Sequence, residues 1–141
     1  MGQKAQSLVE FALIVPLFLL FATGVIYNGL AYAEYLQYNN VARTVARDIA
    51  VAKSAEARKA IVTDLATLDE DTRERYAIPN KFYQPTITVE FEPNDNGSTD
   101  NDAKYVTIKI SLEQAAEDKI DVLVGMKPIS YTMRLESTAS T

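Results

Sequence analysis

The pattern of apolar and polar positions divides the chain into an N-terminal part with helical character and a C-terminal part with strand character. From Phe11 to Ala33 there are 23 consecutive residues without a charged side chain. At a rise of about 1.5 Å per residue, a helix of this length is about 34 Å long, enough to cross a hydrocarbon core of roughly 30 Å. The pattern therefore predicts a membrane-spanning helix at about residues 11–33.

Two roles are open to the apolar run, a membrane anchor or a cleaved secretory signal. A signal has a shorter apolar core, of about 7–15 residues, followed by a cleavage site with small residues. Here the run continues into "EYLQYNNVARTVARDIAVAK", which predicts further helix, so an anchor is favoured. Lys4, on the short N-terminal side, favours an N-terminus in the cytoplasm and a C-terminal domain outside it.

Helical spacing continues beyond the apolar run. One face carries Val41, Val45, Ile49 and Ala52, which predicts an amphipathic helix that ends near Lys53.

Four tyrosines lie where this helix should leave the lipid: Tyr27, Tyr32, Tyr35 and Tyr38. Tyrosine has an apolar body and a polar tip, which suits the membrane interface. These side chains are therefore expected to form an interfacial belt or, alternatively, to pack against the helix of a neighbouring subunit.

A second, shorter helix is predicted after the long one. Ser54 is a candidate N-cap, because its hydroxyl can accept a hydrogen bond from a backbone N–H of the first turn. An apolar stripe follows, formed by Ile61, Leu65 and Leu68. The next residues, "DEDTRERYAIPNK", have no clear periodicity and include Pro79, so this segment is predicted to be a linker.

The C-terminal half has a period of two. Alternation in "TITVEFE", "YVTIKISLE" and "ISYTMRLE" predicts three half-buried strands, and the first two should form a hairpin. Between the second and third strands, "AAEDKIDVLVGM" predicts a short helix with Ile120, Leu123 and Val124 facing inward and Gly125 at its end. An antiparallel sheet with one apolar face needs a cover, which the distal half of the long helix can supply. The predicted fold is α+β, with a long N-terminal helix packed on a three-stranded antiparallel sheet.

Composition narrows the possible functions. Acidic residues outnumber basic ones by 19 to 14, and the net charge of −5 argues against a nucleic-acid partner. The chain has no Cys and no His, which excludes Ser-His and Cys-His catalysis and most zinc sites. We therefore expect neither an enzyme nor a cofactor.

Two groups of acidic residues resemble functional sites, and each also has a simpler explanation. If Gly97 is aligned with the glycine of a calcium-binding loop, the residues at ligand spacing are Glu92, Asn94 and Asn96. Ala103 stands where the bidentate acid should be, so a solvated hairpin loop is favoured.

The second grouping has a four-residue spacing and consists of Glu113, Glu117 and Asp121. Paired carboxylates can act as acid and base only in a sequestered pocket that separates their pKa values. No other catalytic residue type accompanies them, so a solvated helix face is favoured.

The N-terminal sequence resembles a known family. The run "QSLVEFALIVPLFLLF" resembles the TadE-like pseudopilins of tight-adherence (Flp, type IVc) pilus systems. The resemblance covers about Ala5 to Leu20: a small residue, four further residues, Glu-Phe, an apolar run and an early proline. It implies a structural pilin or minor pseudopilin located in the bacterial inner membrane and then in an adhesive cell-surface pilus. Implied partners are other pilin subunits, a prepilin peptidase, the membrane platform of the pilus machine and the lipid bilayer.

The resemblance also implies a processing site. The peptidase cuts just before the apolar segment and leaves Glu as the fifth mature residue, which here places the cut between Ala5 and Gln6. The family usually has Gly before the cut, and this chain has Ala5 there. Cutting after Gly2 instead would make Glu10 the eighth residue. The expected division is a leader-like segment at 1–5, the long helix at 6–53 and an extracytoplasmic helix-and-sheet domain at 54–141.

Glu10 lies next to the apolar run, and a charge at the centre of a bilayer costs roughly 2.5–3.5 kcal/mol on insertion scales. The resemblance implies that Glu10 pairs with the mature N-terminus of a neighbouring subunit, and that Glu10, Phe11 and Pro16 serve assembly. Pro16 would loosen the helix, because proline removes a backbone hydrogen bond. Alternatively, Glu10 sits at headgroup depth, stabilised by the helix dipole.

A different kind of function is also open. Ala5 in place of Gly supports an unprocessed single-pass membrane protein whose external domain binds a ligand or an envelope protein.

Overall fold

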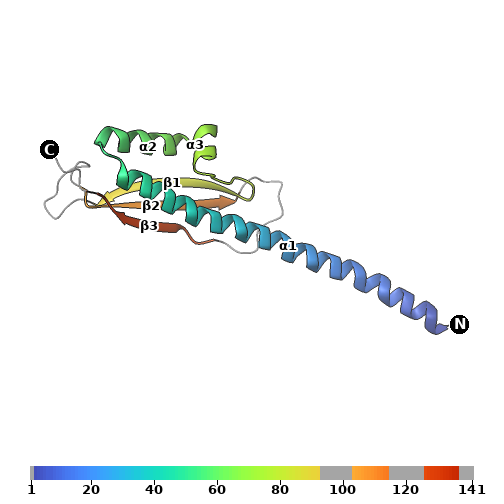
Figure 1. Cartoon of the computed structure of the whole chain (residues 1–141). Coiled ribbons are helices and arrows are strands. Elements are labelled where there is room, and N and C mark those ends of the chain that lie inside the picture. The colour runs from blue at the N-terminus through green and yellow to red at the C-terminus, as the bar shows by residue number, and fades with distance from the viewer. Residues whose placement is uncertain (1, 93–102, 115–125, 137–141) are drawn as a thin grey trace.

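The computed structural model describes residues 2–92, 103–114 and 126–136, with three helices and three strands among them (Figure 1). The helices are α1 (Gly2–Val51), α2 (Ala55–Thr67) and α3 (Glu70–Arg75). The strands are β1 (Tyr83–Glu92), β2 (Tyr105–Gln114) and β3 (Ile129–Arg134). The distal half of α1 packs on the sheet, and its N-terminal half projects away from the rest of the chain (Figure 1). The predicted α+β fold is confirmed.

The long helix is continuous over its 50 residues. It passes through Pro16, whose missing N–H leaves the carbonyl of Ala12 without its helical partner. At the C-terminal end, the N–H of Ala52 still donates to the carbonyl of Asp48 at 3.1 Å. The helix ends at Val51, two residues before the predicted end near Lys53, which is within the usual uncertainty of a helix end.

The sheet is antiparallel with the strand order β1-β2-β3. Ile87 of β1 lies opposite Ile110 of β2, and Ile108 of β2 lies opposite Tyr131 of β3. On β2, Ile108 and Ile110 have no exposed surface, whereas Lys109 between them points to the other face. This alternation follows from the two-residue period of a strand and confirms the predicted strands and hairpin.

The core lies between the apolar face of the sheet and α1. The fully buried residues of α1 recur at helical spacing and are Ala31, Tyr38, Ala42, Val45, Ala46 and Ile49. They meet Val106, Ile108 and Ile110 of β2 in one cluster. The distal half of α1 thus covers the sheet, as predicted.

The opposite face of the sheet is polar. Thr107 and Thr132 are joined by their hydroxyls at 2.8 Å, and Lys109 pairs with Glu90 at 2.6 Å. Side chains of this kind suit contact with water.

Helix α2 begins as the sequence predicts. The Ser54 hydroxyl accepts a hydrogen bond from the N–H of Ala57 at 3.1 Å, and Leu65 is buried in the core. Ile61 and Leu68 are partly buried against the same cluster. The helix ends at Thr67, and the C-cap residue Leu68 adopts a left-handed conformation with φ 48°.

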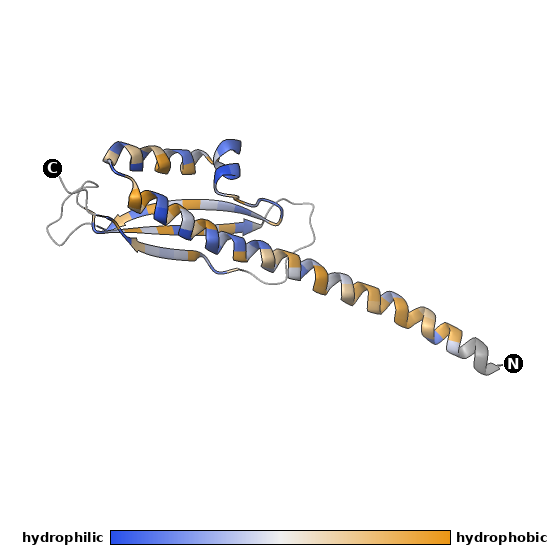
Figure 2. Cartoon of the chain, viewed as in Figure 1, coloured by the Kyte–Doolittle hydropathy of each residue, from blue (hydrophilic) through white to orange (hydrophobic). Residues whose placement is uncertain are grey.

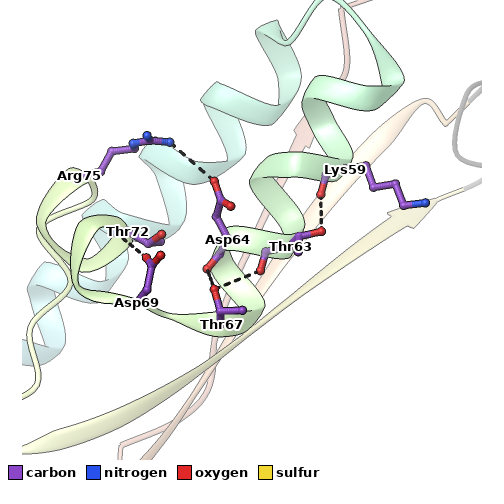
Figure 3. A network of polar contacts seen from close by, with 7 residues as sticks. All are labelled: Lys59, Thr63, Asp64, Thr67, Asp69, Thr72 and Arg75. Atoms are coloured by element: carbon purple, nitrogen blue, oxygen red, sulfur yellow. Dashed lines mark hydrogen bonds and ion pairs between the residues drawn. The ribbon is translucent and has the colours of Figure 1, made fainter.

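The prediction of a linker at residues 69–81 is wrong in its first half, where α3 forms. The Asp69 carboxylate caps α3 by accepting a hydrogen bond from the N–H of Thr72 at 2.9 Å (Figure 3). Arg75 reaches back to Asp64 of α2 at 3.9 Å (Figure 3). Six residues are too few to display a helical stripe, so periodicity could not reveal this element.

Two sequence-based predictions fall on residues 93–102 and 115–125, which lie outside the described residues. They are the calcium-binding or solvated loop around Gly97 and the short helix with Ile120, Leu123, Val124 and Gly125. Glu113 is described, and it lies in strand β2 opposite Gln84. Its assignment to a helix face with Glu117 and Asp121 is therefore wrong.

Candidate functional site

The N-terminal half of α1 exposes a long apolar surface. Large hydrophobic side chains that are more than half exposed cover it from Leu8 to Ile26: Leu8, Val9, Phe11, Leu13, Ile14, Leu17, Phe18, Leu19, Leu20, Phe21, Val25 and Ile26. In Figure 2 most of the ribbon in this half of the helix has the colour of hydrophobic residues. By length and composition, α1 can cross a membrane, and it is the one such helix among the described residues.

The residues singled out by the sequence all lie on this projecting helix. Glu10, Phe11 and Pro16 are exposed, and the exposed fraction of Phe11 is 69%. Ala5 and Gln6 lie in the first turns of α1, and only their backbone is described. The fold brings none of the three exposed residues against the domain. Within the parts of the chain that the structure describes, no hydrogen bond or ion pair of the Glu10 carboxylate is formed.

The domain begins to cover α1 earlier than the end of the uncharged run. Tyr27 meets the ring of Phe82 edge-on, with the centroids 5.1 Å apart, and Ala31 has no exposed surface. The fully projecting part of α1 therefore ends near Ile26, and Leu30 and Tyr32 beyond it remain 51% and 52% exposed. From Ser7 to Ile26 there is about 30 Å of helix, close to the thickness of a hydrocarbon core.

The four tyrosines do not form one belt. Tyr38 is fully buried in the core of its own domain, which corrects both interpretations considered for it. Tyr27 is half-buried against Phe82. Tyr32 and Tyr35 stack with ring centroids 6.2 Å apart. Tyr35 is partly buried against the core cluster, so Tyr32, which is 52% exposed, is the one tyrosine of the four that is exposed as a belt would require.

Sequence reasoning missed a buried carboxylate at this junction, Glu34, which is 6% exposed. Its Oε1 accepts hydrogen bonds from the N–H groups of Phe82 and Tyr83, both at 3.1 Å, and its Oε2 accepts from Phe82 at 3.0 Å. A signal was available in the sequence. Glu34 is the first charged residue after the uncharged run, and Tyr38 follows one helical turn later.

Tyr38 completes this cluster. Its hydroxyl lies 2.7 Å from the carbonyl oxygen of Pro79 and 3.3 Å from both Glu34 Oε1 and the Tyr83 carbonyl. A hydroxyl has one proton, so the shortest contact identifies Pro79 as its main acceptor. We call Glu34, Tyr38 and the segment Pro79–Tyr83 the junction cluster.

The charge of Glu34 affects a neighbouring phenol. Burial, followed by the negative charge of Glu34, raises the pKa of Tyr83 above its ordinary value. The Tyr83 hydroxyl is buried and has no hydrogen-bond partner in the described part of the chain.

The described residues contain no group of three or more His, Cys, Asp or Glu side chains that could hold a metal ion. This region instead has the features of an interaction surface. It is an exposed apolar helix with one carboxylate near its start, and a folded domain packs on its other end.

Comparison with known proteins gives one match. The family described as TadE-like protein matches residues 5–47, which include Glu10, the projecting apolar surface and most of the helix that covers the sheet. No curated protein and no solved structure matches the chain. The matched region contains the motif at Ala5–Leu20 on which the resemblance rests. The match identifies residues 5–47 as TadE-like, consistent with a TadE-like protein of the tight-adherence pilus system.

Proposed function

We propose that this chain is a structural pilin or minor pseudopilin of a type IVc (tight-adherence) pilus that assembles through the N-terminal half of α1. The TadE-like match supports association with this pilus, and the family is structural rather than enzymatic. The observation that carries the proposal is the projecting helix, which exposes apolar side chains from Leu8 to Ile26. In the membrane these side chains contact lipid, and in a filament they contact the same surface of other subunits.

Glu10 supplies the register of this assembly. A prepilin peptidase cuts between Ala5 and Gln6 and creates an α-amino group. The Glu10 carboxylate then pairs with the mature N-terminus of a neighbouring subunit. An ion pair in an apolar site is favourable only when both partners are in place, so a subunit in the wrong register leaves two buried charges. Phe11 and Pro16 act beside it, Phe11 by packing and Pro16 by loosening the helix as the subunit leaves the bilayer.

The chain is then divided by function. Residues 1–5 are a leader that stays in the cytoplasm, residues 6–53 are the helix, and residues 54–141 form the extracytoplasmic domain. The subunit resides in the inner membrane before assembly and in the cell-surface pilus afterwards. Its partners are other pilin subunits, the prepilin peptidase and the membrane platform.

Intact-mass spectrometry of the chain from native membranes and from sheared surface filaments tests this proposal. A chain that begins at Gln6 in the sheared fraction is expected. A chain that keeps Met1 to Ala5 and occurs only in membranes would contradict it.

That second outcome would favour the other candidate function, an unprocessed single-pass membrane protein whose external domain binds a ligand or an envelope protein. The observation in favour of this candidate is Ala5, which stands where the family usually has Gly.

A further inference from the structure

We propose that Glu34 is a positioning residue for assembly, which fixes the height and rotation of the folded domain relative to the projecting half of α1. This inference rests on the proposed function, because it assigns Glu34 a role in the assembly of the same helix.

The contacts of Glu34 are made entirely across the junction. Its carboxylate lies on α1, and its backbone donors, Phe82 and Tyr83, lie at the start of β1, 48 and 49 residues further along the chain. The shared Phe82 N–H reaches both carboxylate oxygens, at 3.1 and 3.0 Å. Two donors at fixed positions define where the carboxylate must lie, and therefore where α1 must lie.

The burial of a carboxylate here calls for a reason other than stability. Burying a charge is costly, and an apolar side chain of similar size often gives equal or greater stability at such a position. The backbone N–H groups of Phe82 and Tyr83 donate hydrogen bonds to the Glu34 carboxylate, and the Tyr38 hydroxyl oxygen lies 3.3 Å from its Oε1. Hydrogen bonds are directional, whereas apolar contacts let a helix slide or rotate. The carboxylate thus fixes the position and rotation of α1 relative to the start of β1.

The segment that Glu34 holds is attached to α1 at three positions, the first two about two helical turns apart and the last two about one turn apart. Phe82 packs on Tyr27, the backbone of Phe82 and Tyr83 binds Glu34, and the Tyr38 hydroxyl binds the carbonyl of Pro79. Tyr27 and Tyr38 are about 16 Å apart along the helix axis. The junction cluster is the part of the domain that meets α1 where the projecting helix begins.

A small change in the angle between the domain and α1 at the junction displaces Glu10 by a large distance. Glu10 lies 24 residues before Glu34, or about 36 Å along α1, so a tilt of about 10° at the junction moves Glu10 by about 6 Å. An ion pair tolerates far less displacement than this. Neighbouring subunits can place Glu10 against its partner only if every domain holds its helix at the same angle.

The test uses the full chain in lipid nanodiscs. Because the sequence has no cysteine, spin labels can be placed specifically at Leu17→Cys on the projecting helix and Thr88→Cys on the polar face of β1, both exposed positions. Pulsed electron paramagnetic resonance then gives the distribution of distances between helix and domain. The variant is Glu34→Gln, in which the amide NH₂ must face at least one of the Phe82 and Tyr83 N–H groups. The matched control is Glu92→Gln, which removes the same charge at an exposed position.

Glu34→Gln is expected to broaden or shift the distance distribution while its circular dichroism spectrum stays that of the parent, and to lower filament incorporation by about tenfold or more. Glu92→Gln is expected to match the parent in both measurements. An unchanged distribution in folded Glu34→Gln would overturn the inference. If Glu34→Gln does not fold, Tyr38→Phe decides in the same way, because it removes the bond to Pro79 and leaves the ring in the core.

The distance measurement is made on unassembled chains, so it tests Glu34 whether or not the chain forms a pilus. If the proposed function is wrong, the parent chain itself will remain unprocessed and will not enter filaments, which is a separate result from the distance measurement.

Discussion

Tyr27 and Phe82 meet edge-on with their ring centroids 5.1 Å apart and their planes at 85°. Tyr27 belongs to the uncharged run, and Phe82 to the segment that leads into the sheet, so this contact joins the apolar helix directly to the folded domain. Its consequence is that the domain begins to cover one face of α1 at Tyr27, inside the uncharged run that ends at Ala33, while Leu30 between them stays 51% exposed.

Glu10→Gln tests the assembly site. We expect the variant to insert into the membrane normally and to enter filaments about 10- to 100-fold less, because a hydrogen bond to a charged group contributes about 1.5–3 kcal/mol. Quantitative immunoblotting of the sheared and membrane fractions measures this. Glu92→Gln serves as the charge-matched control, and wild-type incorporation of Glu10→Gln would rule out the pairing.

Ile49→Ala tests the packing of α1 on the sheet. Ile49 has no exposed surface, whereas Val51 on the same helix is 50% exposed. We expect Ile49→Ala to lower the free energy of unfolding by about 2–5 kcal/mol through lost burial and a residual cavity. Val51→Ala, the control, should change it by less than about 0.5 kcal/mol.

Both values can be measured by denaturant titration in detergent. Equal effects of the two substitutions would show that α1 does not cover the sheet through the Ile49 face.

Tyr83→Phe tests the unpartnered hydroxyl in the junction cluster. Removing a buried hydroxyl without a partner should leave the stability at pH 7 unchanged or slightly raised, since no hydrogen bond is lost. The folded-state pKa of Tyr83 is raised, so its contribution to stability is present below the unfolded pKa of about 10 and is lost as the pH rises through the folded pKa.

Thermal unfolding of the parent between pH 8 and 12 should therefore show a loss of stability that is shallower in Tyr83→Phe. Identical alkaline profiles would contradict this assignment.

Asp69 tests the cap of α3. Hydrogen bonds from the Thr72 side chain and backbone N–H lower the pKa of Asp69. Because the folded-state pKa is lowered, the contribution of ionised Asp69 to stability is present above the unfolded pKa of about 3.9. This contribution is lost as the pH falls through the folded-state pKa. Asp69→Asn keeps a capping oxygen but cannot titrate, so its stability should fall less in acid than that of the parent. Unfolding curves between pH 2 and 6 make the comparison, with Glu70→Gln as the control for loss of a nearby charge.

The elements that the sequence predicted well are those with a local signature. The long helix, the cap at Ser54 and the three alternating strands all follow from patterns within a few residues, because the backbone period alone decides which side chains share a face. The TadE-like motif is local too, since it occupies Ala5 to Leu20.

The elements that the sequence did not predict depend on distant partners. Tyr38 lies three and seven residues before Val41 and Val45, so helical spacing places it on the predicted apolar face. Its hydrogen-bonding partners could not be predicted in this way, because Pro79 and Tyr83 are 41 and 45 residues away. The Glu34 carboxylate accepts hydrogen bonds from backbone N–H groups. Every residue other than proline has such a group, so the residue types in the sequence do not indicate which residues are its partners. Helix α3 is too short for periodicity to reveal.

The amino-acid sequence by itself therefore determined an apolar helix with a carboxylate at its start, a switch to alternating strands, and the absence of Cys and His, all of which are properties of residue type and spacing. Only the tertiary structure decided where the projecting helix ends, which distant groups the Tyr38 hydroxyl contacts, and that Glu34 joins α1 to the start of β1. These features arise when segments more than 40 residues apart come into contact, and the free energy of such a contact depends on burial and hydrogen-bond geometry that a linear pattern does not contain.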